Sequence, residues 1–245
     1  MIPANIEKPF DQIDLGLSHI LDAGAFPIII GGDHCIGFPD AKGVAKHVEG
    51  KLGIIHFDRH IDTAETTMDE RMHTTHWSHA TNLPNVPATN LVQIGIGGGN
   101  HSGVKVAEER DTTVITMFDV EELGVDRAME IALEIAWKDA TAVYLSFDID
   151  VVDPGYAPGT GTPEPGGMSP REALKAVRMV AAEGRAVDLV EIAPPYDVAD
   201  TTSQLGARLI MDTLASLVEH GHLGNRFTRT EREQAERERD RAVGI

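Results

Sequence analysis

The stretch Phe57-Asp58-Arg59-His60-Ile61-Asp62 decides the fold class, together with a second stretch, Ser146-Phe147-Asp148-Ile149-Asp150. Each comes at the end of an apolar run of strand type, and side chains at positions i and i+2 of a strand lie on one face. The side chains with this spacing are Asp58, His60 and Asp62 in the first stretch and Asp148 and Asp150 in the second. Carboxylates gathered at the ends of neighbouring buried strands would repel one another strongly. Two divalent cations would balance the four negative charges, so the pattern predicts a two-metal site.

The remainder of the chain alternates strand-like and helix-like segments, which predicts an α/β fold. The predicted strands are continuous apolar runs, as in a parallel sheet that is covered on both faces. Strands are expected near residues 26–32, 52–57, 91–96, 113–117, 142–147 and 187–192, and helices near 9–24, 39–48, 101–109, 125–137, 170–183 and 203–219. Residues 62–87 lack a period and are interpreted as a functional loop. We therefore expect a three-layer αβα domain with a mostly parallel sheet over residues 1–224, and a charged C-terminal tail over residues 225–245.

The composition excludes several classes of partner. The 245-residue chain has a net charge of −18, which argues against nucleic acid and anionic membranes as partners. A single cysteine, Cys35, excludes an internal disulfide and fits a reducing compartment. The sequence has neither an apolar run of membrane-spanning length nor a signal-peptide pattern at its start. We therefore expect a cytoplasmic protein.

Four motifs resemble the ureohydrolase family of arginases, agmatinases and guanidinobutyrases. They are Gly31-Gly32-Asp33-His34, Asp58-x-His60-x-Asp62, the block from Ser146 to Pro163, and Glu191. The resemblance runs from about residue 2 to about residue 218. It implies an arginase-like fold and metal-dependent hydrolysis of a guanidino compound to urea plus an amine or ammonia. It also implies a homo-oligomer, either a trimer or a hexamer.

The resemblance further implies which residues bind the metal ions. One ion would be held by His34, Asp58, Asp62 and Asp148, and the other by His60, Asp58, Asp148 and Asp150. A ligand set of two imidazoles and four carboxylates suits Mn2+ or Ni2+. It does not match a thiolate-type zinc site. Two such ions lower the pKa of bridging water. Taken singly, His34 is more often a loop histidine, and residues 58–62 alone could be a surface acidic turn, so the prediction depends on the whole set.

Three residues are candidates for substrate chemistry. Glu191 ends an apolar strand, where an unpaired carboxylate would be costly, and the matching family glutamate binds the guanidinium group. The family also places a proton-shuttle histidine in the loop after Asp62. The resemblance implies that Asp62 itself is a catalytic residue as well. This loop contains His73, His76 and His79. We favour His73 over His76 because it is the better positional match.

The sequence departs from the family pattern in the same region. Arg59 replaces the usual alanine, and we expect it either to pair with Glu65 or Asp69 or to reshape the pocket. The segment after Asp62 lacks the asparagine with which arginases bind arginine, so arginine is not the expected substrate. The loop instead resembles an agmatinase-like subgroup that contains nickel-dependent guanidine hydrolases. Within it, Trp77 either contacts the guanidinium group by a cation–π interaction or packs as a loop aromatic.

The sequence also lacks a counterpart of the family's first strand. The chain is expected to be a natural short form or to start inside a longer protein, and the strand near residue 26 would then have an open edge. Guanidine, agmatine and 4-guanidinobutyrate remain the candidate substrates, with guanidine favoured. The alternative is an inactive or weakly active subunit that binds metal and serves in assembly. A one-metal deacetylase fits less well, because Asp62 and Asp150 would then have no role.

Overall fold

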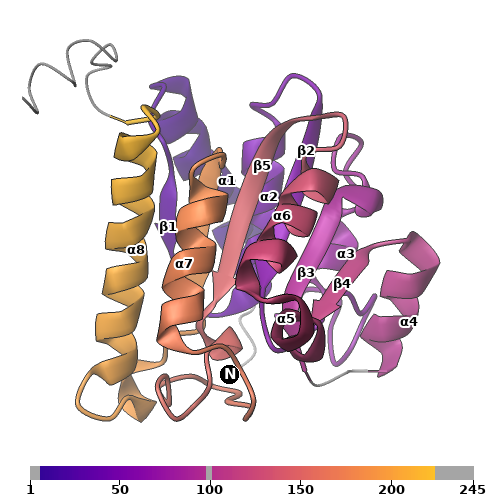
Figure 1. The fold of residues 1–245 in the computed structure, drawn as a ribbon. Helices are drawn as coiled ribbons and strands as arrows, with labels where there is room; N and C mark the ends of the chain where they lie inside the picture. Colours follow the sequence, from indigo (N-terminus) through magenta and orange to yellow (C-terminus); the bar gives the residue numbers. More distant parts are fainter. Residues whose placement is uncertain (1–5, 98–100, 224–245) are drawn as a thin grey trace, which may run out of the picture.

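A six-stranded sheet forms the centre of the computed structural model, which describes residues 6–97 and 101–223 (Figure 1). The strands are β1 (Ile28–Ile30), β2 (Lys51–Phe57), β3 (Leu91–Ile96), β4 (Thr113–Thr116), β5 (Ala140–Asp148) and β6 (Ala186–Val190). Their order is β1-β6-β5-β2-β3-β4, and every pair of neighbours is parallel. The predicted α/β class with a mostly parallel sheet is confirmed. The predicted tail at residues 225–245 lies outside the described residues, and the domain boundary stays a prediction.

Helices cover both faces of the sheet, so the expected αβα layering is also confirmed. They are α1 (Glu7–Asp22), α2 (Gly37–Ala45), α3 (His76–Ala80), α4 (His101–Arg110), α5 (Met117–Leu123), α6 (Val125–Ala136), α7 (Pro170–Ala181) and α8 (Thr201–Glu219). The helices α6, α7 and α8 lie in front of the sheet in Figure 1, and α1 and α2 lie behind it. Two apolar cores result, one on each face, and the central strands β2 and β5 contribute side chains to both. This burial explains why their sequences are continuous apolar runs.

Capping residues determine where two of the helices begin. Ser169 accepts a hydrogen bond from the Glu172 N–H, and the Glu172 carboxylate accepts one from the Ser169 N–H, so the two residues form a reciprocal cap at the start of α7. Thr116 and Asp119 form the same reciprocal pair. That cap starts α5 at Met117, directly after β4, whereas the sequence had suggested a strand extending to Met117. The predicted loop at residues 62–87 also contains the five-residue helix α3, which is too short to show a helical period.

The strand register brings the chemical motifs together at one edge of the sheet. Phe57 of β2 pairs with Phe147 of β5, so Asp58 and Asp148 leave the sheet side by side. Asp148 pairs in turn with Val190 of β6, which places Glu191 one residue beyond the next strand. His34 follows β1 at the same edge. Parallel α/β sheets bind their ligands at this carboxyl edge.

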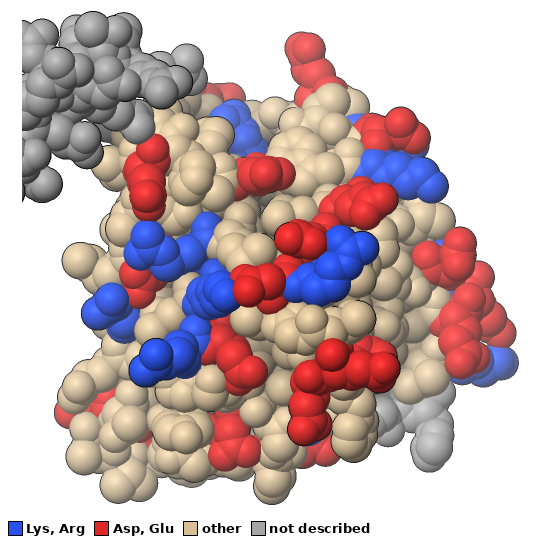
Figure 2. All heavy atoms as spheres, viewed as in Figure 1, with Lys and Arg blue, Asp and Glu red and all other residues tan. Residues whose placement is uncertain are grey.

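Charged side chains of both signs are interspersed on the surface formed by α6, α7 and α8 (Figure 2). Lys175 lies 2.6 Å from Asp126, and Arg178 lies 3.0 Å from Asp212. Basic side chains on this face are therefore neutralised locally and do not form a broad cationic patch. Among the described residues, we find no helix with both the length and the apolar character needed to cross a membrane.

Candidate metal centre and substrate pocket

Three carboxylates converge on the imidazole of His34. Asp33 accepts a hydrogen bond from the Cys35 N–H at 2.8 Å and so caps the short 3-10 helix (His34–Ile36) that carries His34. The His34 Nδ1 atom lies 3.0 Å from Asp148 Oδ2, 3.3 Å from Asp58 Oδ2 and 3.6 Å from Asp62 Oδ2. The ring is buried, with 1% of its side chain exposed. One nitrogen and three oxygens thus face a common point.

A second convergence lies next to the first. The His60 Nδ1 atom is 3.3 Å from Asp58 Oδ1 and 3.0 Å from Asp150 Oδ2. Asp58 therefore directs one carboxyl oxygen toward each histidine, which is the arrangement required of a bridging ligand. The structure brings all six predicted metal ligands into one cluster, although their role as ligands stays a prediction.

The electrostatics of this cluster are those of a cation site. Burial, followed by the charge of Asp58, raises the pKa of Asp62. Burial and the neighbouring charge of Asp150 likewise raise the pKa of Asp148. These buried carboxyl groups resist ionisation because like charges lie close together in a medium of low polarity. Divalent cations would offset that repulsion, so the donor set fits two such ions with oxygen and imidazole ligands.

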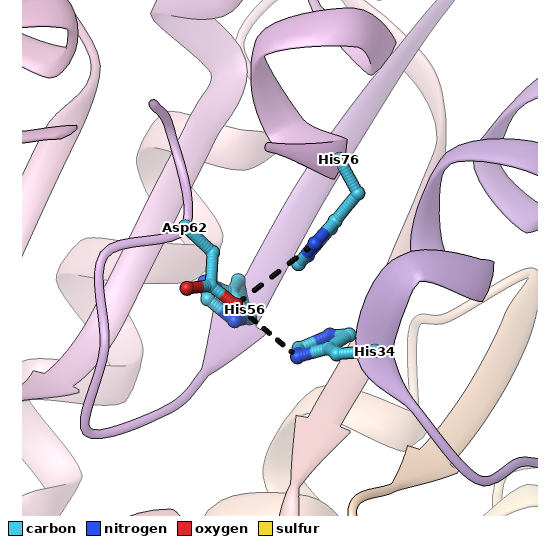
Figure 3. A group of neighbouring side chains, drawn as sticks. All are labelled: His34, His56, Asp62 and His76. Atoms are coloured by element: carbon cyan, nitrogen blue, oxygen red, sulfur yellow. Dashed lines mark ion pairs between the residues drawn. The ribbon is translucent and has the colours of Figure 1, made fainter. Parts of the chain in front are cut away.

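Two further histidines, His56 and His76, lie close to His34 and Asp62, and Figure 3 shows these four side chains as one group. His56 is fully buried, and burial lowers its pKa to about 4, so the ring is neutral. Its Nε2–H donates to Asp58 Oδ2 at 2.8 Å, and the Gln93 amide nitrogen lies 3.4 Å from its Nδ1. We interpret His56 as an orienting partner of Asp58 rather than a ligand, because its nearer nitrogen already carries a hydrogen-bonded proton.

His76 has a related structural role. Its Nδ1–H donates to the His73 carbonyl oxygen at 2.7 Å, and its ring stacks on His34 with 4.1 Å between centroids. Burial lowers the pKa of His76, so this ring is neutral as well. His76 thus holds the backbone of the loop that carries His73. The sequence contained no signal for this contact.

Ser146 determines which nitrogen of His34 faces the carboxylates. The Ser146 hydroxyl donates to Asp188 Oδ1 at 2.9 Å and accepts a hydrogen bond from His34 Nε2–H at 2.9 Å. The Nδ1 atom of His34 is therefore the nitrogen directed into the site. The roles of Ser146 and Asp188 could not be predicted from the sequence, because each residue lies inside an apolar strand and resembles a core position.

A cavity of about 100 Å³ opens beside the cluster. The described residues that line it are His34, His60, Ile61, Asp62, Ala64, His73, Thr74, Gly103, Asp148, Thr162 and Glu191. None of these lining residues is a lysine or an arginine. The cavity therefore presents imidazoles and carboxylates, which suits a small cation.

Two acidic residues of this cavity have left-handed backbone conformations. The φ angle is 62° at Glu191 and 46° at Asp62. Such conformations are unfavourable for residues other than glycine and cluster at functional sites. Glu191 Oε1 accepts a hydrogen bond from the His34 N–H at 2.6 Å, and burial raises the pKa of this carboxyl group. Glu191 is thereby fixed at the cavity beside the metal ligands.

The structure separates the three histidines of the loop. His73 lines the cavity with its side chain 41% exposed, and its Nδ1 lies 3.5 Å from Asp33 Oδ2. The hydrogen bond to Asp33 raises the pKa of His73. His76 is buried behind His34, and His79 donates to the Glu70 carbonyl oxygen at 2.6 Å. Of the three, His73 alone lines this cavity, and its role in proton transfer stays a prediction.

Two expectations about this region are corrected. Trp77 is fully buried and packs against His56 and Tyr144, so it does not reach the cavity and cannot contact substrate there. The packed-aromatic alternative is the one that the structure supports.

Arg59 does not pair with Glu65 or Asp69. Its Nε lies 3.6 Å from Glu164 Oε2, whereas Glu65 lies 3.4 Å from Arg110. The residues that follow Asp62 contact α4 instead, where Thr63 Oγ1 donates to the Gly103 carbonyl oxygen at 2.7 Å.

The fold and the site define a class of α/β proteins that carry an Asp- and His-rich metal centre at the carboxyl edge of a parallel sheet. The chain belongs to the arginase family, whose profile matches residues 1–215. This confirms the family predicted from the sequence motifs.

Relatives of known name support that placement. Guanidinopropionase of Pseudomonas aeruginosa is 36% identical over 202 residues, which are 80% of this chain and 62% of that protein. Mitochondrial agmatinase of Gallus gallus is 36% identical over 221 residues, covering 87% of this chain and 63% of the relative. The chain thus spans less than two thirds of the length of these relatives.

Solved structures agree with the family. Proclavaminate amidino hydrolase from Streptomyces clavuligerus superposes with a TM-score of 0.79 at 32% identity, covering 90% of this chain and 73% of that one. Formimidoylglutamase from Bacillus subtilis gives a TM-score of 0.83 at 25% identity, covering 87% and 68% respectively.

Proposed function

We propose that this chain hydrolyses a small guanidino compound to urea and ammonia or an amine, with two divalent metal ions in the described cluster. Guanidine is the favoured substrate, followed by agmatine and 4-guanidinobutyrate. With guanidine, water adds to the central carbon and one C–N bond breaks, so urea and ammonia account for all atoms. Relatives named for guanidino substrates support the reaction class.

The size and lining of the cavity support guanidine as the favoured substrate. Its volume of about 100 Å³ is well below the roughly 300–1,000 Å³ of pockets that enclose drug-sized ligands. A guanidino acid would bring a carboxylate, yet no lysine or arginine is present among the described lining residues to bind it. A compact cation without an acidic tail matches both observations.

The proposed ligands are those predicted from the resemblance. His34, Asp58, Asp62 and Asp148 would hold one ion, and His60, Asp58, Asp148 and Asp150 the other. A pair of divalent ions lowers the pKa of bound water, which makes hydroxide available near neutral pH. The mixture of imidazole and carboxylate donors is compatible with either Mn2+ or Ni2+.

Residues of the chain supply orientation and proton transfer. Glu191 would pair with the planar guanidinium group through its carboxylate, which orients the central carbon toward the ligand cluster. Asp62 and His73 lie on the cavity wall, where they can hold and move a proton. We assign to His73 the delivery of a proton to the departing nitrogen, because its side chain is accessible and its pKa is raised.

The deciding experiment is urea release from guanidine, agmatine and 4-guanidinobutyrate after parallel reconstitution with Mn2+ or Ni2+. We expect the highest kcat/KM with guanidine. Preferential turnover of agmatine or 4-guanidinobutyrate would retain the reaction class and overturn the substrate assignment. Two bound metal ions without urea from any of the three would overturn the enzyme proposal and favour the inactive-subunit alternative.

A further inference from the structure

Arg59 connects three segments that are distant in sequence. Its Nη1 donates to the Gly95 carbonyl oxygen at 2.8 Å, and its Nη2 donates to the Pro165 carbonyl oxygen at 3.0 Å. The Glu164 carboxylate lies 3.6 Å from Nε. Only 4% of the residue is exposed, although it carries a full charge. A buried guanidinium with several directed contacts is a rigid connector, because its donors form a fixed planar fork.

The backbone around Arg59 is built to accommodate this side chain. A β-carbon at Gly97 would lie 1.8 Å from Arg59 Nη2, so the guanidinium can keep this position only while residue 97 has no side chain. Gly95 has a φ of 93°, and the β3–β4 register shifts between Ile94 and Ile96. This bulge frees the Gly95 carbonyl from the regular ladder, and that carbonyl accepts from Arg59.

The segment that Arg59 contacts contributes Thr162 to the lining of the cavity. We call residues 158–167 the wall segment. At its start, Gly159 N–H donates to Thr202 Oγ1 at 2.8 Å. Near its end, Gly166 N–H donates to Asp153 Oδ2 at 2.8 Å. Both ends are therefore tied to the body of the domain.

The middle of the wall segment has fewer supports and lies closest to the chemistry. Thr162 lines the cavity and donates to Asp150 Oδ2 at 3.2 Å. A β-carbon at Gly161 would lie 3.8 Å from Glu191 Oε2, so this backbone faces the proposed guanidinium-binding carboxylate. Glu164 and Pro165, which Arg59 contacts, directly follow these residues.

We propose that Arg59 is a positioning residue that holds the wall segment against residues 58–62, which carry three of the proposed metal ligands, and so limits the cavity to small guanidino compounds. The side chain does not touch the cavity itself and acts through Thr162 and the Gly161 backbone. The selectivity part, which is the effect of Arg59 on substrate choice, rests on the proposed function. The mechanical part, which is the effect of Arg59 on the position of the wall segment, does not.

The mechanical part is tested by hydrogen exchange of the full-length chain, with and without added metal. We expect the peptide covering residues 157–168 to exchange about tenfold faster in R59A than in the wild type. G97A should reproduce this effect, because the new methyl group displaces the guanidinium without removing it. R110A is the matched control. Like Arg59, Arg110 donates several hydrogen bonds, but its acceptors are Ser78 O, Thr81 Oγ1 and Asn82 Oδ1, which lie outside the wall segment.

The selectivity part is tested by the ratio of kcat/KM for guanidine to that for agmatine. R59A and G97A should lower this ratio about tenfold, and R59K should not restore it, because an ammonium group lacks the planar fork. An equal loss for both substrates, or unchanged exchange of the wall segment, would overturn the proposal. Failure of the wild type to release urea would refute the proposed function alone, and the exchange comparison would still decide the role of Arg59.

Discussion

The buried carboxyl group of Asp40 allows a prediction of how the free energy of unfolding changes with pH. Asp40 lies in α2 with no exposed surface, and its carboxyl group is close to the buried Tyr144 and Asp188. Burial, followed by the charge of Asp188, raises its pKa well above the ordinary value. The folded protein therefore keeps Asp40 protonated at pH values where the unfolded chain, with a pKa of about 3.9, has lost that proton.

The sign and size of the effect follow from linkage. Above the unfolded pKa the folded state binds one more proton than the unfolded state, so the free energy of unfolding falls as pH rises. The slope is about 1.4 kcal/mol per pH unit until the pH reaches the folded pKa. Asparagine has nearly the same shape and does not titrate. Over two pH units inside this window, the free energy of unfolding of D40N should therefore rise by about 2.7 kcal/mol relative to that of the wild type.

The assay is urea-induced equilibrium unfolding of the metal-free protein between pH 5 and pH 8, in the presence of a chelator. D11N is the control, because Asp11 lies on the exposed side of α1, and its curve should run parallel to that of the wild type. Parallel curves for the wild type and D40N would refute the reasoning, since Asp40 would then ionise freely in the folded state.

Four further substitutions test the site. S146A should lower the affinity for the metal by roughly 10- to 100-fold in a chelator competition, because His34 loses its orienting partner; unchanged affinity would contradict that role. E191Q should lower kcat/KM for guanidine by about 100-fold at constant metal content, since a charge-assisted pair is lost. H73A should lower kcat at least about 100-fold with little change in metal content, and an unchanged kcat would exclude proton transfer by His73. D33N removes the contact that raises the pKa of His73, so the limb of the pH–rate profile assigned to His73 should move to lower pH.

The metal cluster could be predicted because its geometry follows from local rules. Asp58 and Asp148 each end a buried strand, and parallel neighbours bring such ends to one edge. His34 and Glu191 follow two further strands at the same edge. Their residue types and strand positions are visible in the sequence before any tertiary contact is known.

Other parts of the site depend on tertiary contacts that local rules do not contain. The burial of Trp77 is set by the packing of α3 near Tyr144, which lies far away in sequence. The partners of Arg59 are likewise remote, and the space that it occupies is visible only as the missing side chain of Gly97. Asp40 has a helical position that suggests exposure, and only the assembled core shows it to be buried. In each case a distant segment decides the environment of the residue.

The way in which the site is held suggests which parts can change without loss of the metal centre. Its floor is formed by carboxylates at strand ends, which are almost completely buried and held by second contacts such as His56 to Asp58 and Ser146 to His34. Its wall is formed by His73 and by Thr162, which lie on exposed or partly exposed loops. Loops tolerate substitution far better than buried polar networks do. A change in the wall can therefore alter which small molecules enter the cavity, while the arrangement of the carboxylates in the floor is kept. Arg59, which directly follows Asp58 and contacts Glu164 and Pro165, lies at the junction between the two parts.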